Sequence, residues 1–187
     1  MPILLHSPAV VASWEGCAET VVVVAAAWVL YACFAAGWDR RRLRSVTGEG
    51  GLRIARTLFG LALIALGVAH LAYVKETAAL VPGWLPAHDI WVYFTGCTYI
   101  AAGLAIGIGV FGHLAASLAT AQMGMFTLLV WVPLVAAAPH DPYQMSELID
   151  SWVLTAGAWV VADSLRPTPW LRVGTAENKK GRECPGP

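Results

Sequence analysis

The fold is decided by the stretch LVPGWLPAHDIW at residues 80–91, which separates two long apolar segments of the chain. Its two prolines exclude a continuous helix, because proline lacks the amide hydrogen and crowds the preceding turn. Its two tryptophans carry amphipathic rings that prefer the headgroup zone of a bilayer. We therefore expect this break to lie at a membrane surface, between one membrane helix over 54–74 and another over 91–111.

The composition excludes an ordinary soluble globular protein. Of the 187 residues, 58% are hydrophobic and 13% are charged, and the mean hydropathy is +0.63. A soluble domain of this size cannot bury so much apolar surface, so we expect a single membrane-embedded domain. The N-terminus lacks the basic segment of a secretory signal peptide, so no cleaved signal is expected. The four cysteines form neither a CxxC pair nor a zinc spacing, and a bridge between Cys17 and Cys97 stays open.

The pattern of apolar segments predicts an all-α membrane protein with five transmembrane helices. Besides the two helices around the break, segments near the length that crosses a bilayer occur at 20–38, 114–135 and 147–165, the last being shorter and less apolar. The expected organisation is an extracytoplasmic segment at 1–17, an additional membrane helix at 18–38, a basic cytoplasmic loop at 39–53, a four-helix membrane core at 54–165 and a disordered cytoplasmic tail at 166–187.

The basic residues predict the orientation of the chain. All Lys and Arg residues except Lys75 lie in the loop after the first helix, at the start of the second helix, or in the tail. With five crossings these regions share one side, and the positive-inside rule places that side in the cytoplasm and the N-terminus outside. The arginine run beside a membrane helix indicates topology and not a nucleic-acid site.

Small and polar residues recur at helical spacing within the apolar segments. Inside a bilayer such residues mark faces that contact other helices. The pattern therefore predicts either tight packing or a shared cavity between helices. The fourth segment carries His113, Ser117, Thr120, Gly124 and Thr127, the third Gly96, Gly103 and Gly107, and the second Gly60 and Gly67.

His70 is the first candidate for a functional residue, since an ionisable group within a membrane helix usually has a partner. One interpretation is a neutral imidazole that bonds Thr95, Tyr99 or a backbone carbonyl. The other is a ligand or proton carrier in an extracytoplasmic pocket. No spacing matches a metal motif, so no metal site is expected. The ligand-binding candidates are His70, Thr95, Tyr99, His88, Asp89 and His140, whereas Asp163 is expected to pair with Arg166 or Arg56.

Several segments resemble the DoxX-like family of small bacterial integral membrane proteins. They are RTLFG at 56–60, GVAH at 67–70, VPGWLP at 81–86 and WVYFTG at 91–96, and GAWVVAD at 157–163 is similar to that family's last helix. The resemblance covers about 54–165 and implies a DoxX-like four-helix bundle in a bacterial inner membrane, to which the first helix is added. His70 corresponds to a family-like position only.

The resemblance also implies a role. Some DoxX-like proteins belong to membrane redox systems, including a subunit of a thiosulfate:quinone oxidoreductase. It therefore predicts an accessory or structural subunit of a membrane complex, with membrane proteins or a second copy of the chain as partners in the lipid bilayer. The alternative is a subunit that binds quinone or another small molecule within a membrane oxidoreductase system. Because no nucleophile–base pair and no phosphate loop occurs, the sequence does not favour an independent enzyme and identifies no catalytic residue.

Overall fold

The structure is a computed structural model that describes residues 11–35 and 37–166. All regular elements in these residues are helices. In chain order they are α2 (Val11–Phe34), α3 (Gly37–Arg42), α4 (Gly48–Ala72), α5 (Val74–Ala78), α6 (His88–Ile108), α7 (Gly112–Phe126), the π-helix η1 (Thr127–Trp131), α8 (Val132–Ala137) and α9 (Pro142–Ser164).

Within the described residues, four helical segments are long and apolar enough to cross a membrane. They are Trp14–Phe34, Gly48–Ala72, His88–Ile108 and Gly112–Ala137. The prediction of four apolar membrane helices over the first four segments is thus confirmed in number and approximate position. The prediction of a fifth membrane helix over 147–165 is not supported.

The fifth helix exists as α9, but its composition sets it apart from the other four. It has 23 residues, and three of them, Glu147, Asp150 and Asp163, are acidic. These three residues make α9 less apolar than the four segments named above. An ionised carboxylate is also costly inside hydrocarbon. Its start is well defined, because Pro142 occupies the first turn and Asp141 caps the helix by accepting a hydrogen bond of 2.9 Å from the Tyr143 amide.

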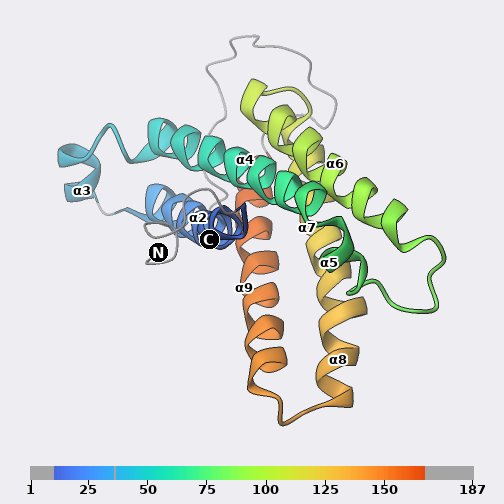
Figure 1. The fold of residues 1–187 in the computed structure, drawn as a ribbon. Coiled ribbons are helices and arrows are strands. Elements are labelled where there is room, and N and C mark those ends of the chain that lie inside the picture. Colours follow the sequence, from blue (N-terminus) through green and yellow to red (C-terminus); the bar gives the residue numbers. More distant parts are fainter. Residues whose placement is uncertain (1–10, 36, 167–187) are drawn as a thin grey trace.

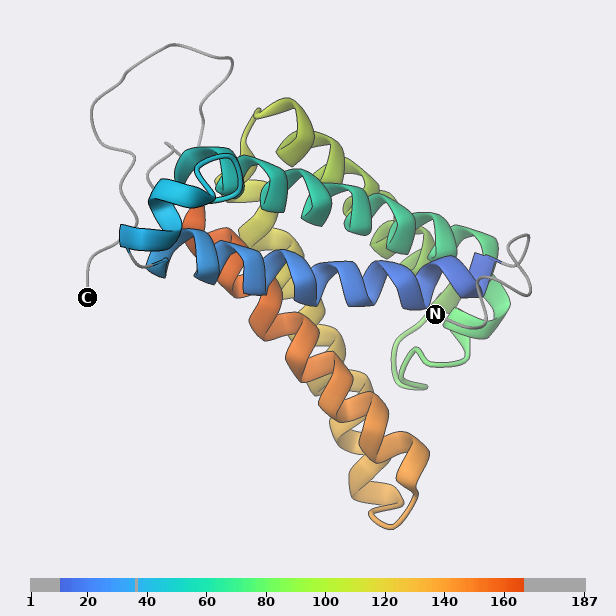
Figure 2. The ribbon, with the colours of Figure 1, turned by 90° about the vertical axis from the view of Figure 1, so that its left-hand side faces the viewer.

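The helices form two groups that diverge from one end of the molecule. Helices α2, α4 and α6 pack side by side, while α7–η1–α8 and α9 form an antiparallel pair. Figure 2 shows this pair running obliquely to α2 and α4, so that the turn between α8 and α9 lies far from the start of α2. The buried core lies where the two groups meet, and Val22, Phe59, Leu63 and Val161 are fully enclosed there.

Glycines allow α4 and α6 to approach until their backbones touch. A Cβ atom added at Gly67 would lie 2.6 Å from the carbonyl oxygen of Gly96, and one added at Gly60 would lie 2.9 Å from that of Gly103. These four residues form the glycine seam of the structure, and the predicted contact faces of both helices are confirmed. Gly107 differs, because a Cβ atom there would meet nothing within 4 Å.

The predicted polar stripe of the fourth segment also faces protein. His113, Thr120 and Thr127 are buried, and the Thr127 hydroxyl lies 2.6 Å from the Ser151 hydroxyl of α9. Gly124 faces the same helix, since an added Cβ atom would lie 3.5 Å from Thr155 Cγ2. The α7–α9 contact is therefore held by hydroxyl groups and ordinary van der Waals contact.

The segment before α4 is more ordered than the sequence predicts. The loop expected at 39–53 contains α3 and the first turn of α4, and α2 begins before the expected helix start. Tertiary contacts explain this order. The indole nitrogen of Trp28 donates to the Val46 carbonyl at 2.9 Å, and Gly51 lets the first turn of α4 press against Ala32 and Val46. The predicted disordered tail, apart from Arg166, and residues 1–10 lie outside the described residues.

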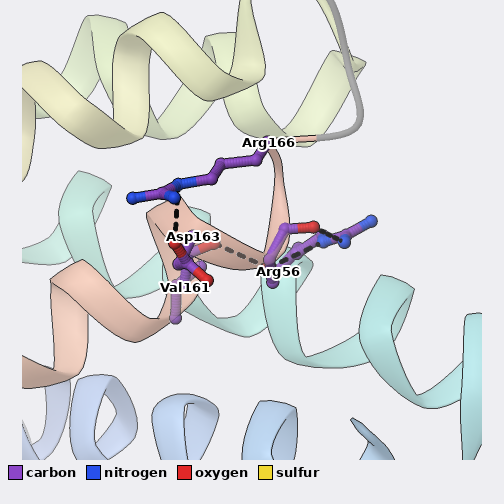
Figure 3. A network of polar contacts seen from close by, with 5 residues as sticks. Arg56, Val161, Asp163 and Arg166 are labelled. Carbon is purple, nitrogen blue, oxygen red and sulfur yellow. Dashed lines mark hydrogen bonds and ion pairs between the residues drawn. The ribbon is translucent and has the colours of Figure 1, made fainter. Parts of the chain in front are cut away.

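Hydrogen bonds from Arg56 join the first half of α4 to the end of α9. The Arg56 guanidinium donates to both the hydroxyl and the carbonyl oxygen of Ser164, with a distance of 3.1 Å from Nε to the hydroxyl (Figure 3). Asp163 instead pairs with Arg166 at 2.6 Å, as one of the two predicted alternatives requires. The end of α9 and the beginning of α4 therefore lie at the same end of the molecule, which we call the basic end.

Candidate functional site

A cavity of about 720 Å³ lies between α6 and α7 and is the candidate site. Its long walls come from residues 91–105 of α6 and 114–130 of α7 and η1. The proline break closes it through Val81, Pro82, Trp84 and Leu85, and Phe111 of the tight turn between the two helices also lines it. The size and the mainly apolar lining match those of small-molecule sites in proteins.

The cavity opens toward the surroundings of the apolar helices. Phe94 of α6 and Leu118 and Met125 of α7 line the cavity, yet more than half of each side chain remains exposed. All three lie within helices that are apolar enough to span a membrane. In a bilayer this opening faces acyl chains, so a molecule dissolved in the lipid reaches the cavity without crossing water.

A small polar group joins the two walls. The Thr98 hydroxyl lies 2.6 Å from Gln122 Oε1, and Gln122 Nε2 donates to the Thr95 carbonyl oxygen at 3.2 Å. Thr95, Thr98 and Gln122 all line the cavity. A hydrogen bond between helices in an apolar surrounding is stabilising and orients the groups that make it. The cavity therefore has a fixed polar point within an otherwise apolar wall.

His70 brings a second polar group to the cavity from the last turn of α4. Its Nδ1 lies 2.9 Å from the Leu66 carbonyl oxygen, and its ring meets the Tyr99 ring edge to face at a centroid distance of 5.6 Å. The backbone-carbonyl partner was one of the predicted alternatives. The structure also places His70 on the cavity wall. The two interpretations of His70 are thus compatible, because one ring nitrogen is used in packing and the other is not.

The remaining predicted candidates separate into two groups. Thr95 lines the cavity, and Tyr99 is buried behind it as the ring partner of His70. His88, Asp89 and His140 do not line the cavity; Asp89 and His140 are exposed, and His88 is partly exposed. The structure therefore brings His70, Thr95 and Tyr99 together and leaves the other three apart.

A set of carboxylates that influence one another lies elsewhere, with Glu15 and Glu19 on α2 and Glu147 and Asp150 on α9. Glu147 lies outside the four apolar helices, and its pKa is raised by burial and then by the nearby charges of Asp150 and Glu15. The described part of the chain contains no group of His, Cys, Asp and Glu residues arranged to hold a metal ion. Cys17 and Cys97 are both free thiols in the structure.

Sequence reasoning missed Gln122, which connects the cavity walls. It is the only Gln or Asn between residues 1 and 143, and it lies within an otherwise apolar helix. Such an isolated amide in a membrane segment is a signal in itself, because its donors and acceptor need partners where water is absent. The stripe of small residues in the same helix drew attention to the opposite contact, with α9.

Comparison with models of protein families, with curated proteins and with solved structures finds no match to this chain.

Proposed function

We propose that this chain is a multi-pass membrane protein that binds a lipid-soluble small molecule of the quinone class in the α6–α7 cavity. The observation that carries the proposal is an apolar cavity of small-molecule size that opens within the apolar helices and contains His70, Thr98 and Gln122. A quinoid ring with an apolar tail suits this combination of an apolar wall with a few polar points. The resemblance to DoxX-like proteins, some of which serve quinone-linked systems, supports the same class of ligand.

The binding test uses a benzoquinone with a decyl tail and the detergent-purified protein. Trp84 and Trp91 line the cavity, so bound quinone should quench the tryptophan fluorescence in a saturable manner. Ala101→Phe places a ring in the cavity wall and should weaken binding about tenfold or more, since the added ring occupies ligand space. Leu104→Phe is the matched control, because Leu104 is an exposed residue of the same helix outside the cavity. Equal affinity of the two variants would contradict the proposed site.

The accessory role in a membrane complex remains a prediction from the resemblance and is compatible with ligand binding. A DoxX-like core over 54–165 belongs to the same proposal. This region is mainly helical apart from its turns and the proline break, with α4, α6, α7–α8 and α9 as its long elements. Purification from native membranes tests the role directly, because partner proteins and bound quinone are identified in the same sample.

We further propose that the basic end faces the cytoplasm, in a cell membrane of bacterial inner-membrane type. The segment before α4 carries Arg41 and Arg42 in α3 and Arg44 in the turn after it, and the Arg56–Ser164 contact holds the end of α9 at this same end. The Arg56–Ser164 contact keeps the end of α9 beside α4 whether or not α9 contacts lipid. A concentration of arginine favours the cytoplasmic side of a membrane.

Thiol labelling in intact cells tests the orientation. In a variant without native cysteines, Ala87→Cys in the proline break should react with a membrane-impermeant reagent. Ser45→Cys, at the basic end, should react only after the membrane is permeabilised. Both positions are exposed, so accessibility of the side chain does not differ between them. The reverse labelling pattern would overturn the proposed orientation.

A further inference from the structure

The hydrogen bond of His70 determines which of its ring nitrogens carries the hydrogen. The Leu66 carbonyl oxygen can only accept, so Nδ1, which lies 2.9 Å from it, is the donor. In the neutral imidazole the other nitrogen, Nε2, then has no hydrogen and acts as an acceptor. The backbone of α4 thus fixes the tautomer of His70.

Nε2 is left available at the cavity wall. Within the described part of the chain it makes no hydrogen bond, and it is not among the fully buried atoms that lack a partner, so it retains accessible surface. His70 lines the cavity, and its ring is held by the edge-to-face contact with the buried Tyr99. A positioned acceptor beside an apolar cavity favours a ligand that supplies a donor, because no water from a bilayer core can do so.

We propose that His70 Nε2 accepts a hydrogen bond from a hydroxyl group on the head of the bound molecule, so that the cavity prefers a hydroquinone or phenol over the corresponding quinone or ether. This inference rests on the proposed function and specifies its ligand. A quinone carbonyl and a methyl ether have no hydrogen to donate, so each leaves Nε2 without a partner. The preference concerns binding alone and requires no chemical step.

The test compares three probes that share the decyl tail: the benzohydroquinone, its dimethyl ether and the quinone. Affinities are measured without oxygen by displacement of a fluorescent apolar probe from the wild-type protein. The hydroquinone should bind about three- to tenfold more tightly than the ether and the quinone, which is the range expected for one hydrogen bond. This arm requires no variant and therefore does not depend on the folding of one.

Two substitutions assign the preference to His70. His70→Phe keeps an aromatic ring beside Tyr99 but has no acceptor, so the three probes should bind with equal affinity. His70→Gln keeps an acceptor oxygen and should retain part of the preference. Equal affinity of the probes for the wild type, or an unchanged preference in His70→Phe, would overturn the inference while leaving the binding site intact. Absence of binding of all three probes to the wild type would overturn the proposed function itself and this inference with it.

Discussion

On one side of α6 the backbone of α4 comes into direct contact with it, whereas on the other side α6 and α7 leave a cavity of about 720 Å³ between them. In the chain α4 precedes α6 with only the short helix α5 between them, α7 follows α6 directly, and both neighbours are apolar. The difference is in the side chains at the contact. Glycines meet glycines across the α4–α6 seam, while the cavity walls combine alanines with large side chains such as Phe94 on α6 and Phe126 on α7.

Helix contacts in a membrane depend on such local differences. Lipid is as apolar as the helices, so burial alone does not draw two helices together, and close packing of small residues stabilises their contact. Where large side chains such as Phe94 and Phe126 lie between two helices, they hold the helices apart, and the space beside the alanines of the walls is available to a ligand. The seam and the cavity are therefore two outcomes of the same rule on one helix.

The largest expected effect is at the seam. Gly67→Ala adds a Cβ atom 2.6 Å from the Gly96 carbonyl oxygen and 2.7 Å from Ile100 Cγ1. Because the first neighbour is backbone, α4 and α6 must move apart, and the free energy of unfolding should fall by about 1–3 kcal/mol. Unfolding in mixed micelles, followed by far-UV circular dichroism, measures this change.

The matched control is Gly107→Ala on α6, the helix that α4 contacts at the seam. An added Cβ atom there meets nothing within 4 Å, and alanine favours the helix over glycine by about 1 kcal/mol. This variant should therefore be as stable as the wild type or more stable. If Gly67→Ala and Gly107→Ala unfold at the same denaturant concentration, the close contact of α4 with α6 does not exist in the protein.

Much of the seam could be predicted from the sequence, because glycines at helical spacing need only the period of the helix to be recognised. The proline break could also be predicted, because its two prolines exclude a continuous helix. Two other features differ from the prediction. The π-helix at Thr127–Trp131 precedes Pro133, whose ring crowds the carbonyl of Leu129, and the sequence does not tell whether a helix bends, ends or widens there. The polar composition of α9 lowered the number of apolar spans below the predicted five.

The site could be predicted only in part, because a cavity is a property of the separation between two helices. His70 and Thr95 stood out as polar residues in apolar segments, and both line the cavity. His88, Asp89 and His140 were candidates because they were expected on the same side of the membrane as His70, but they lie near helix ends, where such residues are common at a membrane surface. Residue type identified polar candidates, whereas the structure was needed to select among them.

The smaller expected effect is at the cavity, where Gln122 links α7 to α6. Gln122→Met keeps the length of the side chain and removes its bonds to the Thr98 hydroxyl and the Thr95 carbonyl. The Thr98 hydroxyl retains an acceptor, since the Thr95 carbonyl oxygen lies 2.9 Å from it. These bonds join two membrane helices, and each such bond contributes about 0.6 kcal/mol on average, so the free energy of unfolding should fall by about 1 kcal/mol.

A double-mutant cycle with Thr98→Val determines how much of this change belongs to the link between the helices. The coupling between residues 98 and 122 should be about 0.5–1 kcal/mol, because each single substitution already removes the bond between them. A coupling near zero would mean that the amide and the hydroxyl do not meet. A loss for Gln122→Met larger than that for Gly67→Ala would reverse the comparison of the two faces of α6: the polar link at the cavity, and not the glycine seam, would then be the contact on which the stability of the fold mainly depends.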